Sequence, residues 1–205
     1  MMHPHCRLVF INEDIGHGVF ATAFIPAGTI TYVRDDLDIV IQPDDPRLAQ
    51  EDYFRIIDTW AYREPSGEFV LGWDISRYVN HSCDANTLST GYGFEIAIRD
   101  ILPGEQITDD YGLLNIDTEM SCGCRTDKCR WNIQPDDIAF FSDRWDELLR
   151  PAIALVPGVE QPLLRYIDDT MWAEVLKYIN TGRHYRSVSL LQYPGISGNA
   201  GVSLS

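Results

Sequence analysis

The chain has 205 residues, of which 16 are basic and 31 acidic, and its formal net charge is −15. That length is enough for one domain with its own core, or for one domain and a small extension. The acidic balance argues against direct nucleic acid binding and favours basic partners, although it would also serve solubility alone. The longest apolar runs, such as residues 153–156, are too short to span a bilayer. No secretory signal is recognisable at the N-terminus, so we expect a cytoplasmic protein, or a nuclear one in a eukaryote.

The first two thirds of the chain consist of short apolar runs separated by Gly- and Pro-containing turns. A helix interrupts them over residues 45–59, where Pro46 suits the first helical turn. The alternation of apolar and polar residues and the turn signals predict six β-strands, over residues 8–11, 18–22, 30–33, 39–41, 69–71 and 94–98. We therefore predict a mainly β fold class for this part of the chain.

The composition changes after Cys129, and helical patterns replace the strand patterns. A second apolar stripe runs from Leu164 to Ile179, and Gly182 follows it at a suitable C-cap position. The last residues, 192–205, are rich in Gly and Ser, and we expect them to be mobile. Another apolar stripe lies before these segments, directly after the cysteines, and Pro151 should end or kink it. It comprises Ile138, Phe141, Trp145, Leu148 and Leu149.

Three of the five cysteines, Cys122, Cys124 and Cys129, lie within eight positions of one another. Without a secretory signal, metal binding is a better interpretation of this spacing than a disulfide framework. A structural zinc site needs four ligands, so a fourth must come from Cys83, Cys6 or a histidine. The alternative is that the three thiols are free and buried.

Two polar loops, residues 77–86 and 104–112, are rich in hydrogen-bonding groups, and each alone indicates little. Together with two further motifs they resemble the SET-domain protein lysine methyltransferases that carry a post-SET zinc segment. The resemblance covers residues 6–134. The four motifs are Gly16-His17-Gly18-Val19-Phe20; Arg77-Tyr78-Val79-Asn80-His81-Ser82-Cys83 followed by Asn86; Arg99-Asp100-Ile101 and Pro103-Gly104-Glu105 leading to Asp110-Tyr111-Gly112; and Cys122-Gly123-Cys124 followed by Cys129-Arg130.

The resemblance implies a SET domain over residues 6–112, a β-clip of short strands in which one segment threads under another as a pseudo-knot. A post-SET zinc segment would follow over residues 113–134. We expect an α-helical extension over 135–182 and a flexible tail over 183–205. The extension could cover the SET body, form a dimer face or dock a partner, with intramolecular packing favoured.

The resemblance implies S-adenosylmethionine as cofactor. The glycine turn would let the backbone approach it closely. The side chain of His81 could instead be a buried packing group, and Trp131 and Ile133 could either cover the adenine or pack the zinc segment. The expected cofactor-binding residues are Ile15, His17, Arg77, Tyr78, Asn80, His81, Trp131 and Ile133.

The family also supplies the fourth zinc ligand, Cys83, which would join Cys122, Cys124 and Cys129 around a zinc ion. Cys6 would then remain as a small buried apolar residue. Tyr111 corresponds to the catalytic tyrosine, which would orient the amine and the methyl group for direct in-line transfer to a lysine side chain. The tyrosine is not expected to act as the base.

The expected substrate is a basic protein, such as a histone, a DNA-packing protein or a ribosomal protein. One departure from the family is Asp109, where relatives carry Tyr or Phe that helps decide how many methyl groups are added. A carboxylate there could hold the substrate ammonium, bind water or face solvent, which leaves the number of methyl groups open. Another amine, such as a protein N-terminus, is also open, as is the oligomeric state.

Two other functions compete with methyl transfer. The first is a catalytically weak SET-fold module that binds peptide and zinc, for which Asp109 is the best support. Retention of Asn80, His81 and Tyr111 argues against it. The second is a stand-alone zinc interaction protein without cofactor affinity.

Overall fold

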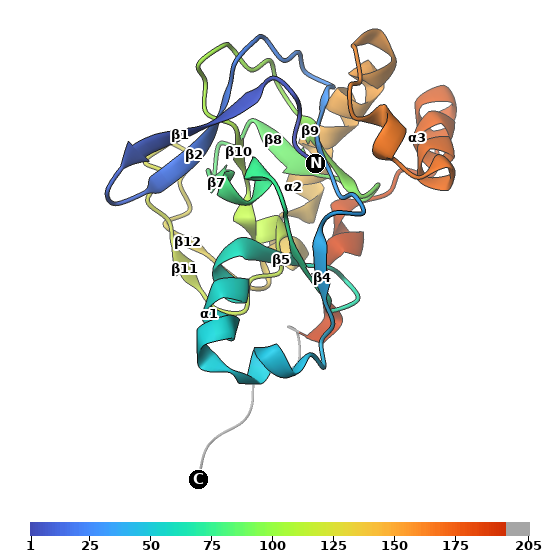
Figure 1. Ribbon diagram of the computed structural model, residues 1–205. Coiled ribbons are helices and arrows are strands. Elements are labelled where there is room, and N and C mark those ends of the chain that lie inside the picture. The colour runs from blue at the N-terminus through green and yellow to red at the C-terminus, as the bar shows by residue number, and fades with distance from the viewer. Residues whose placement is uncertain (196–205) are drawn as a thin grey trace.

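The computed structural model describes residues 1–195. Its body consists of short strands, with α1 below them and α2 and α3 on one side (Figure 1). All six predicted strands are present. The predicted fold class, a body of short and mostly antiparallel strands followed by C-terminal helices, is confirmed.

The antiparallel strands form a hairpin and two three-stranded sheets. Residues 87–89 and 61–63 form strands that the sequence did not predict. The hairpin pairs β1 (Cys6–Asn12) with β2 (Gly16–Ala21). One sheet has the order β3 (Ile30–Val33), β9 (Phe94–Ala97), β8 (Thr87–Ser89), and the other β4 (Ile39–Ile41), β6 (Phe69–Leu71), β5 (Ala61–Arg63).

Two very short strand pairs hold the expected functional loops. β7 (Asn80–His81) pairs in parallel with β10 (Thr108–Asp109). This pairing brings together the two polar loops, about 30 residues apart, as the threaded crossing of a SET fold requires. β11 (Met120–Ser121) pairs with β12 (Asn132–Ile133) and closes the cysteine segment.

The helix expected over residues 45–59 is divided in two. A 3₁₀ turn, Pro46–Ala49, is capped by the Asp45 carboxylate, which accepts a hydrogen bond from the backbone of Arg47. The α-helix α1 begins only at Glu51 and runs over Glu51–Trp60, because Gln50 adopts an extended conformation (φ −105°, ψ 114°). The sequence pattern does not predict this one-residue break in the helix.

The helix α2 spans Asp137–Leu155, so Pro151 does not end it. Pro151 removes one backbone hydrogen bond, but Ile153 in the turn that follows is completely buried, and that burial favours continuation. Ile138, Trp145 and Leu149 are buried as the stripe predicts, whereas Leu148 is 45% exposed at its edge.

The stripe from Leu164 to Ile179 is also interrupted. A 3₁₀ turn, Leu164–Tyr166, precedes an extended Ile167, and α3 (Asp169–Thr181) begins after its N-cap Asp168. Gly182 ends α3 in a left-handed conformation (φ 65°), as predicted.

The chain after α3 packs back onto the body, contrary to a separate tail from residue 183. Val188, in the 3₁₀ turn Val188–Leu191, is fully buried, and its backbone N–H donates to Asp146 at 3.0 Å. Residues 196–205, to which the expectation of mobility also applied, lie outside the described residues.

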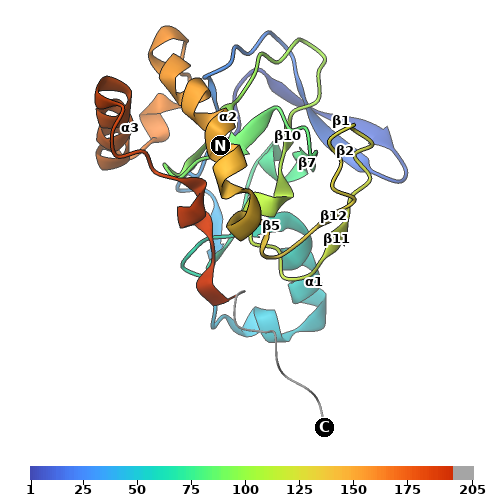
Figure 2. The same cartoon turned by 180° about the vertical axis from the view of Figure 1, so that it is seen from behind.

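The main core lies between the β3–β9–β8 sheet and α2 (Figure 2). Ile30, Leu88 and Ile96 of the sheet pack in one cluster with Ile138 and Leu149 of the helix. Helix α2 therefore covers the strand body, which was the favoured one of its three expected roles. Within residues 1–195, no helix is both long and apolar enough to cross a membrane.

Candidate active site

A cavity of about 350 Å³ lies between α1, β5 and the loop around Tyr111. Tyr111 lines it, and its hydroxyl donates a hydrogen bond to the backbone oxygen of Val79 at 2.7 Å. Arg77 lines the same cavity. The catalytic candidate and one cofactor candidate, 34 positions apart, therefore line one cavity.

The environment of Tyr111 keeps its hydroxyl protonated. Burial raises its pKa above the ordinary value, and the nearby carboxylates of Asp109 and Glu95 raise it further. A phenol in this state can donate or accept a hydrogen bond but is a poor proton acceptor. The geometry thus suits orientation of a reactant rather than base catalysis.

The glycine turn and the Asn80 loop are in direct contact. The Asn80 side chain donates to the backbone oxygen of His17 at 3.0 Å. A Cβ atom at Gly18 would lie only 2.9 Å from the Asn80 amide nitrogen, so this approach requires glycine. The ring of Tyr78 packs edge-on against His17, with centroids 5.9 Å apart. Ile15 is exposed at the end of the same hairpin.

His81 links the Tyr111 loop to the cysteine cluster. Its Nδ1 accepts a hydrogen bond from the backbone N–H of Tyr111 at 3.1 Å, and its Nε2 lies 3.3 Å from the Cys83 sulfur. Burial lowers the pKa of His81, against the opposing charge of Asp110. In a neutral ring with Nδ1 accepting, the proton is on Nε2, which can donate to the sulfur.

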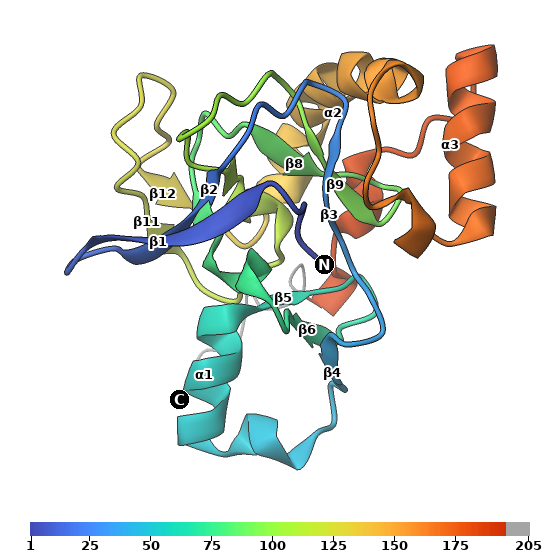
Figure 3. The ribbon, with the colours of Figure 1, turned by 45° about the horizontal axis from the view of Figure 1, so that its top comes forward.

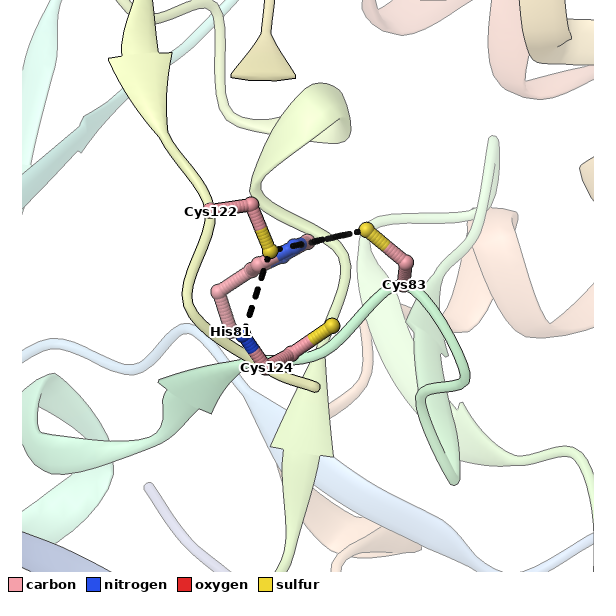
Figure 4. A group of neighbouring side chains, drawn as sticks. All are labelled: His81, Cys83, Cys122 and Cys124. Carbon is pink, nitrogen blue, oxygen red and sulfur yellow. Dashed lines mark hydrogen bonds between the residues drawn. The ribbon is translucent and has the colours of Figure 1, made fainter. Parts of the chain in front are cut away.

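The four cysteines expected to bind zinc come together, and Cys6 is not among them. Figure 4 shows that Cys83, Cys122 and Cys124 converge with His81. The atoms of these four residues that could bind a metal all lie within 4.8 Å of one another. The Cys122 sulfur is 3.7 Å from the sulfurs of both Cys83 and Cys129. Four thiolates at zinc–sulfur distances of about 2.3 Å would be about 3.8 Å apart, which matches the two separations of 3.7 Å.

The protonation of the thiols reflects their surroundings. Burial raises the pKa of Cys83 and of Cys122 above the ordinary value. At Cys124 burial acts in the same direction, but hydrogen bonds with Thr126 prevail and lower its pKa to about 6. Backbone N–H groups of Arg130 and Trp131 donate to the sulfurs of Cys83 and Cys129, at 3.3 and 3.4 Å. Such donors stabilise thiolates and hence metal binding.

The two adenine candidates differ sharply in exposure. Trp131 is 75% exposed and has a left-handed backbone (φ 66°), so its indole is free to cover a ligand. Ile133 is fully buried beside Cys83 and Cys122. For Ile133 the structure therefore favours the packing role. Cys6, half-buried, packs against the core under the β1–β2 hairpin, and burial raises its pKa to about 12.

One ionic network was not foreseen from the sequence. The Arg130 guanidinium makes two 2.6 Å hydrogen bonds to the carboxylate of Asp110 and a third, at 3.1 Å, to Asp137 of α2. The indole of Trp145 donates to Asp110 at 3.2 Å. The network ties the cysteine segment, the residue before Tyr111 and α2 together. The only sequence signal was that Arg130 directly follows a ligand and Asp110 directly precedes Tyr111.

A second group missed by the sequence is the carboxylate of Glu95, which lines the cavity together with Asp109. Alternation along residues 94–98 placed Glu95 on the face opposite Phe94, but did not show that this face lines a cavity. Asp109 is 2% exposed, so of the three possibilities at this position, facing solvent is excluded.

Comparison with known proteins identifies this architecture. Residues 16–112 match the family model of the SET domain. This segment contains β2, the Asn80–Cys83 loop and Tyr111. Residues 16–112, just under half of the chain, are therefore similar to a SET domain.

Its relatives are histone-lysine methyltransferases by name. It is 34% identical over 140 residues to histone-lysine N-methyltransferase Set2 of Drosophila melanogaster, covering 61% of this chain and 6% of that protein. A probable histone-lysine N-methyltransferase, set-23 of Caenorhabditis briggsae, is 29% identical over 108 residues, covering 48% and 43%. The chain thus spans less than half the length of these curated relatives.

Among solved structures, the methyltransferase domain of human histone-lysine N-methyltransferase SETMAR is similar to this chain. The match covers 65% of this chain and 58% of the SETMAR chain. The sequence identity is 21% and the TM-score 0.40.

Proposed function

We propose that this protein transfers a methyl group from S-adenosylmethionine to a lysine amine of a basic protein. The observation that carries the proposal is the placement of Tyr111, partly buried, hydrogen-bonded to Val79 and lining a cavity that Arg77 also lines. The SET-domain match and the names of the relatives support the same reaction.

The cofactor supplies an electrophilic methyl group on a sulfonium. The hairpin residues Ile15 and His17 and the neighbouring Tyr78 and Asn80 would hold it, together with Arg77, the backbone of His81 and the exposed indole of Trp131. The hydrogen bond from Asn80 to the backbone oxygen of His17 supports this assignment, because it joins the glycine turn to the Asn80 loop.

The chain contributes to the reaction mainly by positioning the reactants and by excluding water from them. A lysine ammonium has a pKa of about 10.4 and must lose a proton before it can attack. Burial and the sulfonium charge lower that pKa, whereas the nearby carboxyl groups of Asp109 and Glu95 act in the opposite direction, and alignment of amine and methyl provides much of the rate enhancement. Tyr111 would orient the reacting groups through its hydroxyl.

We assign zinc to Cys83, Cys122, Cys124 and Cys129. The sulfur separations of 3.7 Å support this set. His81 would act outside the ligand set, since the Tyr111 N–H occupies its Nδ1 and its Nε2 donates to Cys83. The metal would hold the post-SET segment against the Tyr111 loop.

The substrate class follows from charge. A formal net charge of −15 favours a basic protein, for which a histone, a DNA-packing protein and a ribosomal protein are the candidates. The names of the relatives favour a histone among these.

Tyr111→Phe tests the proposal. With labelled S-adenosylmethionine and core histones or basic protein extract, we expect transfer by the native protein and a loss of about 100-fold or more in the variant, since catalytic hydrogen bonds typically contribute this much. Tyr166→Phe is the matched control and should keep full transfer, because Tyr166 does not line the cavity and its hydroxyl accepts a hydrogen bond from Arg165. Cofactor binding by calorimetry without any transfer would instead favour a peptide- and zinc-binding module.

A further inference from the structure

Two acidic side chains share the cavity wall near Tyr111. Asp109 comes from β10 and is 2% exposed, and Glu95 comes from β9, between the buried Phe94 and Ile96. Both lie close enough to Tyr111 for their charges to raise the pKa of its hydroxyl. Two consecutive strands thus direct carboxylates to the place where the reacting amine would arrive.

Neither carboxylate forms an ion pair with a basic side chain anywhere in residues 1–195. Asp109 accepts a 2.8 Å hydrogen bond from the backbone N–H of Asp110 and a 3.5 Å one from the Ser89 hydroxyl. Both are neutral donors. No hydrogen bond of Glu95 occurs among the described side chains.

Two arginines line the same cavity, and one of them, Arg77, donates to the backbone oxygen of Gly72 at 3.5 Å and lies over the ring of Tyr78. Arg63, which lines the same cavity, pairs with Asp117, and its guanidinium lies 4.3 Å from the centre of the Phe69 ring. The Met1 amine, whose charge reaches Glu95, pairs with Asp35 at 3.1 Å. Buried acidic groups without a counterion are costly, and a cation entering the cavity would remove that cost.

We propose that Asp109 and Glu95 form an acidic amine pocket that binds the substrate amino group as a primary ammonium ion. This inference rests on the proposed methyltransferase function and specifies which amine it accepts. A primary ammonium offers three N–H donors, and carboxylates are acceptors only, so each donor can be satisfied. The cavity of about 350 Å³ has room for a four-carbon side chain.

The pair is suited to a single positive charge. Burial raises the pKa of Glu95 to about 7, and burial together with the charge of Glu95 raises that of Asp109. Near neutral pH the two carboxylates therefore carry less than two negative charges, as closely coupled acids do. A bound ammonium would stabilise their ionised forms.

The pocket also distinguishes amines by methylation. Each methyl group replaces one N–H donor and adds bulk, so a trimethylammonium ion offers no donor to either carboxylate. We therefore expect the pocket to favour an unmethylated amine and the protein to stop at few methyl groups.

The test uses n-butylammonium, which has the chain and charge of a lysine side chain. The zinc-loaded full-length protein is melted near neutral pH with n-butylammonium chloride, butyltrimethylammonium chloride, 1-butanol or sodium chloride at matched concentration. We expect n-butylammonium to raise the melting temperature by roughly 2–4 °C over sodium. The other two probes should give less than half of that shift.

Asp109→Asn and Glu95→Gln keep shape and remove charge, and either should abolish the n-butylammonium shift. Glu13→Gln, an exposed change in the β1–β2 turn, is the matched control and should retain it. Equal shifts for all variants, or for n-butylammonium and butyltrimethylammonium, would overturn the proposal, as would no shift in the native protein. Because both variants are isosteric and each removes one charge, the test still works if one of the two fails to fold.

The outcome is separable from that of the proposed function, because the measurement involves neither S-adenosylmethionine nor methyl transfer. Transfer lost in Tyr111→Phe together with an absent n-butylammonium shift would leave the methyltransferase standing without the acidic pocket. A specific shift without any transfer would leave an amine-binding cavity in a protein of another function.

Discussion

The cysteine segment and helix α2 both cover the Tyr111 loop, but they do so by different physical means. The cysteine segment, residues 113–134, has two strands of two residues each and a small buried cluster around Cys83, Cys122 and Ile133. Helix α2 places Ile138, Trp145 and Leu149 in the largest core of the protein. In Figure 3 the cysteine segment, with β11 and β12, lies to the left of α2.

With the proposed zinc site, one cover would depend on a metal and the other would not. A segment with so little apolar burial hardly offsets the entropy of ordering its backbone, and the proposed thiolate–zinc bonds would supply the missing stability. Helix α2 obtains its stability from the hydrophobic effect. Arg130 joins the two regions, because it reaches from the cysteine segment to Asp110 and to Asp137 of α2.

The largest effect should come from removing the metal site. Cys122→Ser, or a strong chelator, should eliminate bound zinc, open residues 113–134 to proteolysis and abolish methyl transfer, while the helical circular dichroism signal of α2 persists. Metal analysis, limited proteolysis and the transfer assay measure these results. Cys6→Ser, which leaves the cluster intact, should retain one zinc. Loss of α2 together with the metal would contradict the independence of the two covers.

The next effect should come from Arg130→Gln, which leaves the Asp110 carboxylate buried without its cation. Removing one partner of such a pair typically lowers the free energy of unfolding by about 3–5 kcal/mol. Urea unfolding of the zinc-loaded protein provides the measurement. Lys128→Gln breaks an exposed pair with Asp84, in which both side chains are about half exposed, and should cost about 1 kcal/mol or less. Equal losses in the two variants would argue against Arg130 as the link.

The smallest of the three effects should come from α2 itself. Leu149→Ala creates a cavity in the main core and should lower the free energy of unfolding by about 2–5 kcal/mol. The zinc stoichiometry should stay unchanged, because the cysteine segment does not depend on this packing. The adjacent Leu148, 45% exposed, is the control, and its change to Ala should cost about 0.5 kcal/mol or less. Comparable losses at both positions would show that the helix face is assigned incorrectly.

Local patterns predicted most of the strand body and the residue types of the site. Strands 30–33, 39–41 and 69–71 appear at their predicted bounds, because apolar runs between turn residues specify short strands directly. The helices were predicted less accurately. The breaks at Gln50 and Ile167 depend on backbone conformations that periodicity does not detect, and the continuation through Pro151 depends on burial against a distant sheet.

By itself, the sequence determined the order of the motifs, the clustering of Cys122, Cys124 and Cys129, and the position of Tyr111 after two acidic residues. Only the tertiary structure decided that Glu95 meets Asp109, that Arg130 bridges Asp110 to α2, and that His81 turns Nδ1 to Tyr111 and Nε2 to Cys83. The reason is physical. Spacing along the chain fixes which groups are neighbours within a loop, whereas cavity walls and ion pairs join strands and helices that only packing brings together.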